Sequence, residues 1–411
     1  MEEPIAINAI KRAAVEHREA QISGPQPERY VAPPTGKRIA VVGSGPSGLT
    51  ATYYLASRRG HDVTLIEGLP KLGGMLVAGL PEYKVPRDLL QREIELVCAT
   101  RVEARVGAWV ESIEELVHEY DAVLLAVGYT KSQFLDVQST VGVEHATDFL
   151  REVNLGQRLT APDSLIVIGG NNVAMDAARS ALRIGAKKVT VLMPSDRAGA
   201  EAQHHEVADA ELEGVVVEEL TRPVSISRRL DATFEVAVES SEGMITDQLS
   251  GGASDAVKKK RHSIIADGVL MSVGVVADVP SSWRVSVGNL GRIETSPDAQ
   301  MTSRDGVFAA GDVVTGPGSI VDAMDQGKRA AVAIDQFLGG DGDISETFAP
   351  ATGSEMEMRA DIAAQGKPVV PMPMAEASTR RATFEIVERG YTKDQAIDEA
   401  RRCIRCDLWR M

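Results

Sequence analysis

The glycine spacing of a phosphate-binding turn occurs in one run of the chain, Gly43-Ser44-Gly45-Pro46-Ser47-Gly48. In such a turn the first glycine permits a tight bend, the second lets the backbone approach a pyrophosphate, and the third allows close helix packing. The free N–H groups at the start of the next helix then face the anion. Glu67 follows Gly48 by 19 positions, where a carboxylate can accept hydrogen bonds from ribose hydroxyls. These residues predict a dinucleotide site.

A second run in the same context lies further along the chain, Gly169-Gly170-Asn171-Asn172-Val173-Ala174. Asn171 replaces the middle glycine, and we expect it to tolerate left-handed backbone while its side chain occupies space near the phosphates. Met193 stands where the first unit has Glu67, and only Arg197 follows as a cation that could hold a 2′-phosphate. We therefore expect a nicotinamide nucleotide, NAD(H) in preference to NADP(H), with a degenerate structural copy as the alternative.

The elements that position the two runs repeat one order: strand, glycine turn, helix, strand. In the first unit the pattern predicts a strand, a helix and a strand over 38–42, 49–59 and 62–67, and in the second over 164–168, 173–184 and 188–193. Gly169 lies 126 positions beyond Gly43, and Met193 lies 126 positions beyond Glu67. A constant offset of this kind indicates a duplicated βαβ unit.

Further elements follow from apolar runs and helical spacing. Strands are expected over 121–127 (ending at Gly128), 215–218, 233–238, 263–275 and 307–310, and helices over 5–17 and 320–338. Residues 341–390 carry little periodicity. A last helix should begin at Thr392, with an apolar stripe formed by Ala396, Ile397, Ala400 and Ile404.

Composition excludes several classes of protein. The chain has 411 residues, enough for two to three domains, and a net charge of −15, which argues against a nucleic-acid partner. Its three cysteines cannot supply a disulfide framework or a four-cysteine cluster, and His204-His205 lacks the spacing of a metal site, so no metal is expected. No secretion signal and no run of ~20 apolar residues occurs, so we expect no membrane partner and a cytoplasmic location.

Three stretches, in order and spacing, resemble the FAD/NAD(P) flavoproteins typified by the small subunit of glutamate synthase: "KRIAVVGSGPSGLTATYYLASRRGHDVTLIEGLPKLGGMLVAGLPEYKVP", "VIGGNNVAMDAARSALRIGAKKVTVL" and "GVFAAGDVVTGPGSIVDAMDQGKRAAVAI". The resemblance covers about Lys37 to Leu338. It implies an α/β fold with two Rossmann-like domains: an FAD domain over 37–155 and 270–340, interrupted by an NAD(P) domain over 156–269. Residues 1–36 then form a helix and arm, and 341–411 an extension that ends in a docking helix.

The resemblance also implies which residues meet each cofactor. The FAD diphosphate and ribose should lie at Gly43, Ser44, Gly45, Pro46, Ser47 and Glu67, and Gly128 should also contact FAD. The flavin should lie near Leu72, Gly73, Gly74, Leu80 and Pro81, with Gly311 and Asp312 near the ribityl phosphate end and Ser319 and Ile320 beneath the ring. The nicotinamide nucleotide should lie at Gly169, Gly170, Asn171, Asn172, Val173 and Arg197. No catalytic side chain is implied, because the flavin performs the chemistry.

Both ends of the chain depart from the family pattern. The run Glu399–Asp407, "EARRCIRCD", is similar to the entry of a ferredoxin-like iron-sulfur domain, but the chain stops five residues beyond Cys406. The N-terminal "PIAINAIKRAAVEH" is similar to the helix that follows such a domain. We therefore expect the cluster domain itself to be missing. Cys403 and Cys406 could belong to a remnant docking helix, a metal site shared with a partner, or a redox dithiol.

These features favour a flavoprotein oxidoreductase subunit. It would exchange hydride with NAD(H) and pass single electrons to a ferredoxin-like iron-sulfur subunit and further catalytic subunits of a larger complex. The resemblance leaves the complex open: a 2-oxoacid oxidoreductase such as phenylglyoxylate dehydrogenase, in which NAD+ would be reduced, or a glutamate-synthase-type assembly that oxidises NADPH. A noncatalytic FAD scaffold and a self-contained flavin reductase or oxidase remain further alternatives.

Overall fold

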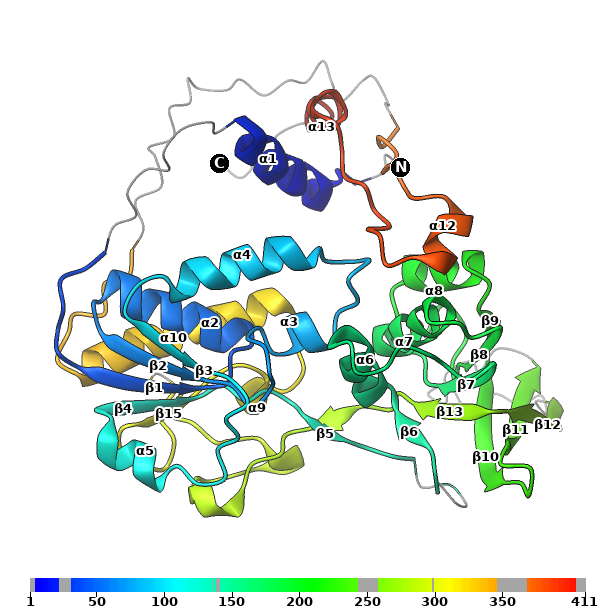
Figure 1. Cartoon of the computed structure of the whole chain (residues 1–411), viewed down its shortest axis with the longest axis horizontal. Coiled ribbons are helices and arrows are strands. Elements are labelled where there is room, and N and C mark those ends of the chain that lie inside the picture. The colour runs from blue at the N-terminus through cyan, green and yellow to red at the C-terminus, as the bar shows by residue number, and fades with distance from the viewer. Residues whose placement is uncertain are drawn as a thin grey trace, which may run out of the picture. The chain divides into compact units, whose positions relative to one another are not determined.

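The computed structural model describes residues 4–21, 31–135, 137, 141–242, 258–297, 299–345 and 368–403. These residues divide between two compact units. The main unit comprises Val31–Ile344 and Ala377–Glu385, and it contains every named strand (Figure 1). The terminal unit is drawn from both ends of the chain: Met1–Tyr30, Ser345–Glu376 and Ile386–Met411.

The first sheet of the main unit has five parallel strands in the order β15-β4-β1-β2-β3. They span Val307–Ala309, Ala122–Leu125, Arg38–Val42, Asp62–Ile66 and Val102–Arg105. Apolar side chains fill both faces, as a parallel sheet between covering layers requires. Helix α2 (Pro46–Tyr53), which continues as a π-helical turn over Tyr54–Arg58, packs with α10 (Ile320–Phe337) and α4 (Arg87–Cys98) on one face. Helix α5 (Glu114–Glu119) and residues 275–293 contribute to the core on the other.

The second sheet also has five parallel strands, in the order β6-β13-β7-β8-β9. They span Glu144–His145, Gly268–Met271, Ser164–Ile168, Lys188–Leu192 and Val216–Glu218. Helices α6 (Ala146–Asn154), α7 (Asn172–Arg183) and α8 (His204–Leu212) pack on one face. The antiparallel strands β10 (Thr221–Arg228), β11 (Phe234–Glu242) and β12 (Lys258–Ala266) cover the other face. The expected fold class, with two Rossmann-like domains, is thereby confirmed.

Several expected elements have different bounds. The single strand expected over 263–275 is instead β12, β13 and β14 (Val275–Val276), which lie in three different sheets. The chain turns at Asp267, whose carboxylate accepts hydrogen bonds from the backbone N and the Oγ of Ser164 at 2.9 and 2.6 Å. The helix expected to begin at Leu49 begins at Pro46, because proline is already set for the first helical position. The second sheet includes β6, which precedes the boundary at 156 expected from the sequence.

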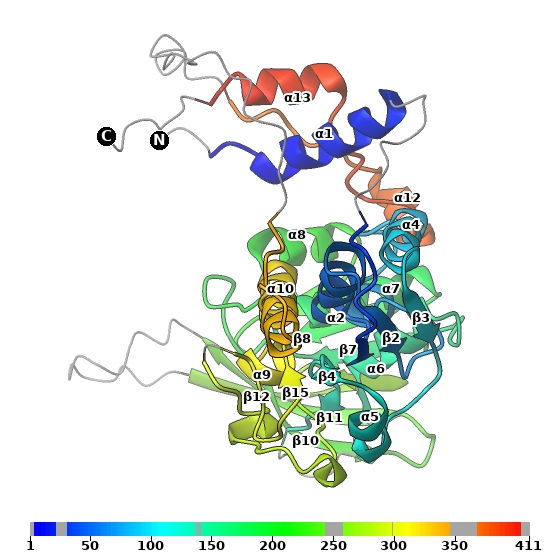
Figure 2. The same ribbon diagram turned by 90° about the vertical axis from the view of Figure 1, so that its left-hand side faces the viewer.

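The terminal unit pairs helix α1 (Ile7–Gln21) with α13 (Lys393–Ala400), which lie side by side in Figure 2. Ala9, Ala13 and Tyr391 form its buried core. Of the expected apolar stripe on α13, Ala396 is half-buried and packs against this core. Ile397 and Ala400 are exposed, whereas Glu399 is fully buried, and Ile404 lies outside the described residues.

Glu399 explains how the two ends of the chain are joined. Its carboxylate accepts hydrogen bonds from the backbone N–H groups of Ala6 and Val370, both at 2.9 Å, and from the Arg402 guanidinium at 2.6 Å. A buried carboxylate needs such partners, since an unpaired buried charge is very costly. The carboxylate thus ties both helices to the segment at Val370.

Within the described part of the expected irregular region 341–390, residues 341–345 and 368–390, the chain forms the short helix α12 (Ala377–Ala382), which belongs to the main unit. Among the described helices, none is both long enough and apolar enough to cross a membrane.

Candidate functional site

The first glycine turn follows β1 at the carboxyl end of the sheet. Gly43 has a φ of +103°, and a β-carbon there would lie 2.4 Å from the carbonyl oxygen of Ala126. A β-carbon on Gly48 would lie 1.9 Å from the carbonyl oxygen of Gly43. Both positions therefore exclude a side chain. At Gly45, by contrast, an added β-carbon would meet no described atom within 4 Å, so the backbone has open space in front of it.

Glu67, at the end of β2, braces this turn. One of its carboxylate oxygens accepts hydrogen bonds from the backbone N and the Oγ of Ser44 at 2.9 and 2.5 Å, and the other accepts one from the backbone N of Leu69 at 2.9 Å. A carboxylate offers about four acceptor positions, so these three donors leave capacity for a ribose hydroxyl. Glu67 thus has a structural role that the motif alone did not reveal.

Two further segments converge on the same turn. The backbone N of Gly73 donates to Ser44 Oγ at 2.9 Å, and a β-carbon on Gly74 would come within 2.9 Å of Gly45 Cα. From the third motif, a β-carbon on Gly311 would come within 2.9 Å of Ser47 Cβ. The expected residues Gly45, Gly73, Gly74 and Gly311 are therefore neighbours, although the sequence separates them widely.

Ser47 provides a direct test of whether an FAD diphosphate fits. Its hydroxyl is buried in the first turn of α2 and has no hydrogen-bond partner among the described residues. A buried hydroxyl without a partner is costly, and a phosphate oxygen would satisfy it. Together with the open backbone at Gly45 and the N-terminus of α2, the unpaired hydroxyl fits an anionic cofactor.

The third motif lies at the start of two helices. Gly311, at a φ of +81°, precedes α9 (Asp312–Thr315), and burial raises the pKa of the half-buried Asp312. Ser319 caps α10 in a reciprocal pair with Asp322, whose backbone N donates to Ser319 Oγ at 3.1 Å. Ile320 follows with 44% of its surface exposed, and Val321 and Met324 are exposed beside it. A flat apolar ligand could cover this end of α10.

The remaining expected flavin contacts lie in two loops. Gly128 follows β4 with a φ of +67°, and an added β-carbon there would meet no described atom within 4 Å. Leu80 is half-buried and Pro81 is buried after α3 (Met75–Ala78). Arg87 secures that loop by donating to the carbonyl oxygens of Leu76 and Leu80.

The second glycine turn shows why asparagine replaces glycine. Asn171 has a φ of −104°, so its backbone is extended and the tolerance of asparagine for left-handed backbone is not needed here. Its Oδ1 accepts hydrogen bonds from the backbone N of Ala174 at 3.0 Å and from Ser272 Oγ at 2.7 Å, and its Nδ2 donates to the carbonyl oxygen of Ser272 at 3.1 Å. Asn171 thus caps α7 and ties it to the end of β13.

The other glycines of this turn are sterically required. A β-carbon on Gly169 would lie 2.3 Å from the carbonyl oxygen of Ser272, and one on Gly170 would lie 2.8 Å from Met193 Cγ. Asn172 Oδ1 accepts a hydrogen bond from the backbone N of Gln203 at 3.0 Å, and Val173 packs beside the core under α7.

Arg197 does not stand free after β8. Its Nη2 lies 2.7 Å from Glu211 Oε1 and its Nε lies 3.2 Å from Glu219 Oε1, while 41% of its side chain is exposed. Met193 is fully buried. The cation expected near the nucleotide ribose is therefore already paired with two carboxylates.

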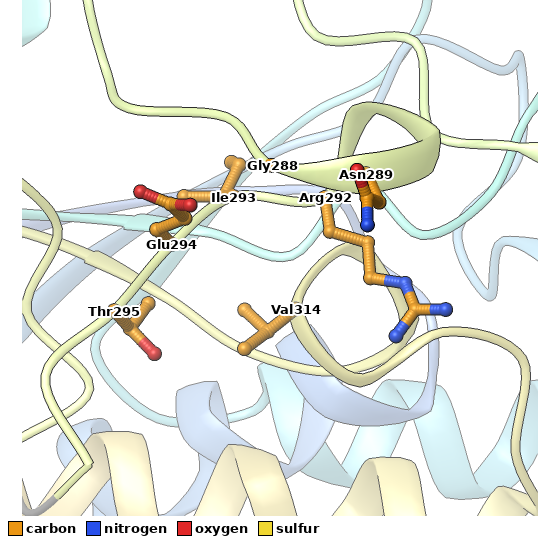
Figure 3. A pocket seen from close by; sticks show the side chains of 7 residues that line it. All are labelled: Gly288, Asn289, Arg292, Ile293, Glu294, Thr295 and Val314. Atoms are coloured by element: carbon orange, nitrogen blue, oxygen red, sulfur yellow. The ribbon is translucent and has the colours of Figure 1, made fainter.

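A wide hollow of ≈ 650 Å³ lies beside α9 (Figure 3). It is lined by Gly288, Asn289, Arg292, Ile293, Glu294, Thr295 and Val314. Arg292 donates to the hydroxyl of Tyr129 at 2.9 Å and to the carbonyl oxygen of Thr315 at 3.3 Å. The described lining of the hollow includes none of the expected nucleotide-binding residues, so the hollow is distinct from the glycine turns.

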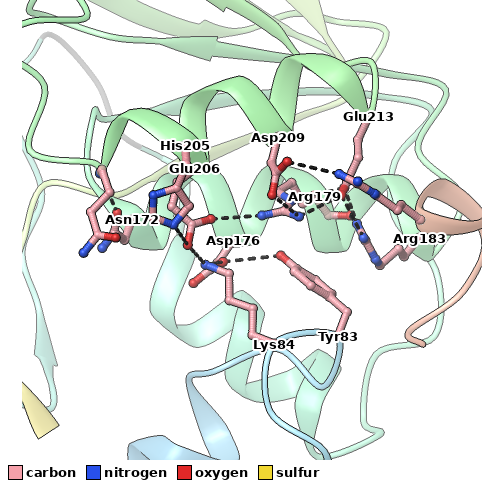
Figure 4. Close-up of polar contacts among 12 residues, drawn as sticks. Tyr83, Lys84, Asn172, Asp176, Arg179, Arg183, His205, Glu206, Asp209 and Glu213 are labelled. Atoms are coloured by element: carbon pink, nitrogen blue, oxygen red, sulfur yellow. Dashed lines mark hydrogen bonds and ion pairs between the residues drawn. The ribbon is translucent and has the colours of Figure 1, made fainter. Parts of the chain in front are cut away.

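A charged cluster beside α7 was missed by the sequence analysis (Figure 4). It joins Tyr83 and Lys84, from the loop after α3, to Asp176, Arg179, Arg183, Glu206, Asp209 and Glu213. The available signal was the spacing of Asp176, Arg179 and Arg183, which places three charges on one face of an otherwise apolar helix.

The cysteines lie apart from both turns in the sequence. Cys98 is half-buried at the end of α4, and burial raises the pKa of its thiol. Cys403 is exposed, and Cys406 lies outside the described residues. In the part of the chain that the structure describes, no three His, Cys, Asp or Glu side chains group together in a way that could hold a metal ion.

Comparison with known proteins finds relatives that are named as subunits of NADP-linked enzymes. The chain is 34% identical to the NADP(+)-dependent formate dehydrogenase subunit beta of Moorella thermoacetica, over 99% of this chain and 62% of that protein. It is 29% identical to the NADPH-Fe(3+) oxidoreductase subunit beta of Geobacter sulfurreducens, over 99% of this chain and 66% of that protein. It is also 29% identical to the glutamate synthase [NADPH] small chain of Escherichia coli, over 74% of this chain and 69% of that protein. The chain thus spans less than two thirds of the first two relatives.

Solved structures share the fold. FprA from Mycobacterium tuberculosis superposes with a TM-score of 0.61 at 20% identity, over 74% of this chain and 85% of that one. Thioredoxin reductase from T. acidophilum gives 0.56 at 20% identity, over 74% of this chain and 100% of that one. A family model for pyridine nucleotide-disulphide oxidoreductases matches residues 9–147 and 37–327. The expected resemblance is confirmed, and the chain belongs to this family of FAD- and NAD(P)-dependent oxidoreductases.

Proposed function

We propose that this chain is an electron-transfer subunit that holds FAD at the first glycine turn and NAD(H) at the second, and that exchanges electrons with a partner subunit. The observation that carries the proposal is the convergence at the first turn. Ser44, Gly45, Ser47, Gly73 and Gly311 meet there around an unpaired buried hydroxyl and the start of a helix.

The chain's own residues would bind and orient the flavin cofactor. Ser47 and the backbone at Gly45 would donate to the diphosphate, and Glu67 would accept from the adenosine ribose. Asp312, at the start of α9, would accept from the ribityl chain, and the exposed start of α10 at Ile320 would lie beneath the ring. When bound, FAD supplies two-electron exchange with a nicotinamide and one-electron exchange with other carriers.

We further propose that NAD(H) is preferred to NADP(H), although the relatives named above are NADP-linked by name. Arg197 is held by Glu211 and Glu219, and these carboxylates would repel a 2′-phosphate placed beside them. Since Arg197 is partly exposed, it could still exchange its partners. The discrimination should therefore be modest.

The electron partner is proposed to be an iron-sulfur subunit within a larger complex. Three relatives are named as beta subunits or a small chain, which supports an assembly of several chains. Cys98 has no neighbouring cysteine in the sequence, so a disulfide relay of the CxxxxC type is not available to carry electrons there. A 2-oxoacid oxidoreductase that reduces NAD+ and a glutamate-synthase-type complex that oxidises NADPH both fit. A cytoplasmic location remains a prediction.

One observation favours a second candidate, a noncatalytic FAD scaffold. At the second turn Asn171 is hydrogen-bonded to Ser272, and Arg197 is paired with carboxylates. The side chains that would meet a nucleotide are therefore already bonded within the protein. A scaffold would retain FAD but would not bind a nicotinamide nucleotide.

The test is purification of the native complex through an affinity tag on this chain, identification of the co-purified subunits, and anaerobic addition of NADH. The proposal expects a flavin-bearing assembly that includes an iron-sulfur subunit, whose clusters become reduced as seen by electron paramagnetic resonance. Clusters that stay oxidised with NADH and with NADPH, while the flavin is retained, would favour the scaffold. A flavin-bearing chain that purifies alone and reduces oxygen or a dye would indicate a self-contained reductase.

A further inference from the structure

One lysine bridges the two Rossmann-like domains. Lys84 lies in the loop after α3, which belongs to the first domain, and its Nζ lies 2.6 Å from Asp176 Oδ1 of α7 and 2.5 Å from Glu206 Oε1 of α8 (Figure 4). Beside it, the fully buried Tyr83 donates its hydroxyl to Asp176 Oδ1 at 3.3 Å. Two adjacent residues of one domain thus bind two helices of the other.

A buried layer of charge supports this contact. Arg179 lies 2.9 Å from Glu206 and 2.7 Å from Glu213, and Arg183 lies 2.6 Å from Glu213. The Arg183 guanidinium also stacks over the Tyr83 ring, 3.8 Å from its centroid. Because these side chains are almost wholly buried, each charge requires its partner, and the layer has little freedom to rearrange.

Helix α12 and the residues that follow it also contact the cluster. Arg380 Nη1 lies 3.0 Å from Asp209 Oδ1 on α8, and the Phe384 ring lies 6.3 Å from the Tyr83 ring between centroids. A separate contact crosses the same boundary, where Asn154 Nδ2 of α6 donates to the carbonyl oxygen of Ala78 at 2.9 Å. The two domains are therefore joined by several independent polar contacts around the loop after α3.

The position of Lys84 links both nucleotide sites. Leu80 and Pro81, proposed to lie beside the flavin, come three to four residues before it in the same loop. Asp176 lies near the start of α7, five residues after Asn171, which caps this helix in the second glycine turn. A shift of Lys84 relative to Asp176 would move one site against the other.

We propose that Lys84 is a positioning residue for hydride exchange: by holding Asp176 and Glu206 it sets the approach of the nicotinamide to the flavin. The inference rests on the proposed function for its chemical consequence. It adds a residue that touches neither nucleotide. Hydride exchange is steeply sensitive to geometry, and a misplacement of about 1 Å can lower a rate about a hundredfold.

The test compares three variants of the full-length flavoprotein with a control. Lys84→Met removes the charge at similar length, Lys84→Arg keeps it, and Lys84→Met with Asp176→Asn removes the carboxylate that would otherwise be left buried without its lysine. Lys187→Met is the control, since the ion pair of Lys187 within the described part of the chain is with the exposed Asp163, at 2.7 Å. Each protein is measured for flavin content, thermal midpoint, and dissociation constant and limiting rate of flavin reduction with NADH. Amide hydrogen exchange without nucleotide is measured in parallel.

For Lys84→Met we expect flavin content to be retained, the NADH dissociation constant to stay within about threefold, and the limiting reduction rate to fall roughly ten- to a hundredfold. Hydrogen exchange should rise in residues 81–85 and in the first turns of α7 and α8, but not in α2 or α10. Lys84→Arg should recover most of the rate. The double variant should regain the thermal midpoint while its rate remains low.

Recovery of the rate in the double variant would show that Lys84 merely neutralises a buried carboxylate, and would overturn the proposal. A rate within twofold of the parent in Lys84→Met would do the same. If the parent protein is not reduced by either nucleotide, the proposed function fails, and hydrogen exchange decides the structural claim separately. Unchanged exchange in residues 81–85 and α7 of Lys84→Met would then reject it.

Discussion

Gly327 of α10 lies directly against Ser47 of α2, so closely that a β-carbon on Gly327 would come within 2.2 Å of the Ser47 carbonyl oxygen. The same serine meets Gly311 on its other side, where an added β-carbon would lie 2.9 Å from Ser47 Cβ. Gly311 and helix α10, which come late in the chain, thus pack against the first glycine turn and the start of α2. The glycines permit helix contact without displacing the hydroxyl of Ser47.

Gly327→Ala should therefore loosen the first site. The added methyl group meets backbone atoms that have little room to move, and overpacking of this kind costs about 1–3 kcal/mol. We expect a lower thermal midpoint and partial loss of FAD during purification. Gly199→Ala is the matched control, because Gly199 is exposed and its nearest neighbour is the side chain of Asp196. Equal flavin retention in the two variants would show that the α2–α10 contact does not support the site.

Glu67 should determine FAD affinity, both as a ligand and as the brace for Ser44. Replacement by alanine removes hydrogen bonds to a charged group, each worth about 1.5–3 kcal/mol. Glu67→Ala should weaken FAD binding roughly ten- to a hundredfold, measured by titrating flavin-depleted protein with FAD. Glu103→Gln, at an exposed carboxylate on β3, should leave the affinity unchanged. An unaltered dissociation constant in Glu67→Ala would remove this residue from the site.

The pairing of Arg197 makes a prediction about nucleotide choice. Exposed ion pairs are worth about 0.2–1 kcal/mol each, so replacing both Glu211 and Glu219 with glutamine should raise NADPH affinity about two- to tenfold with little change for NADH. The measurement is the nucleotide concentration that gives half-maximal flavin reduction. Glu235→Gln, at an exposed partner of Arg229, is the control. A strong NADPH preference in the unaltered protein would show that another cation reaches the 2′-phosphate.

Glu399 predicts a pH dependence confined to the terminal unit. Burial alone would raise the pKa of this carboxyl group, but the N–H groups of Ala6 and Val370 and the Arg402 guanidinium hold the pKa below its ordinary value. The stabilisation is present above the unfolded pKa of about 4.3 and is lost as the pH falls through the lower folded value. In the parent protein, amide hydrogen exchange in α1 should accelerate over that acidic range. In Glu399→Ala, it should already be accelerated at neutral pH. The flavin content of Glu399→Ala should stay unchanged. Loss of flavin from this variant would mean that the terminal unit also supports the FAD site.

The sequence was most informative where sterics leave few choices. Gly43, Gly48 and Gly169 lie where an added side chain would clash with the backbone, so the glycine spacing predicted both glycine turns and their order. The parallel strands were found for a related reason, since strands buried on both faces read as continuous apolar runs. The edge strand β3, with the sequence VEAR, escaped notice because its outward side chains carry no such pattern.

Residues that act through distant partners could not be predicted. Asn171 resembled a tolerated replacement for glycine, yet its role depends on Ser272, which lies 101 positions away. Glu399 was not among the residues of the expected apolar stripe, and its partners Ala6 and Val370 come from other parts of the chain. Lys84 was not singled out from the sequence, because its partners Asp176 and Glu206 lie on α7 and α8, far along the chain.

The proposed function requires that one chain hold both nucleotides close enough for hydride exchange. The most direct measurement is an anaerobic titration of the isolated flavoprotein with NADH, followed through the absorbance of the flavin. We expect one equivalent of NADH to reduce one equivalent of bound FAD in a single fast phase whose rate saturates with NADH concentration. Flavin that stays oxidised in the presence of excess NADH and NADPH, with FAD fully bound, would contradict it.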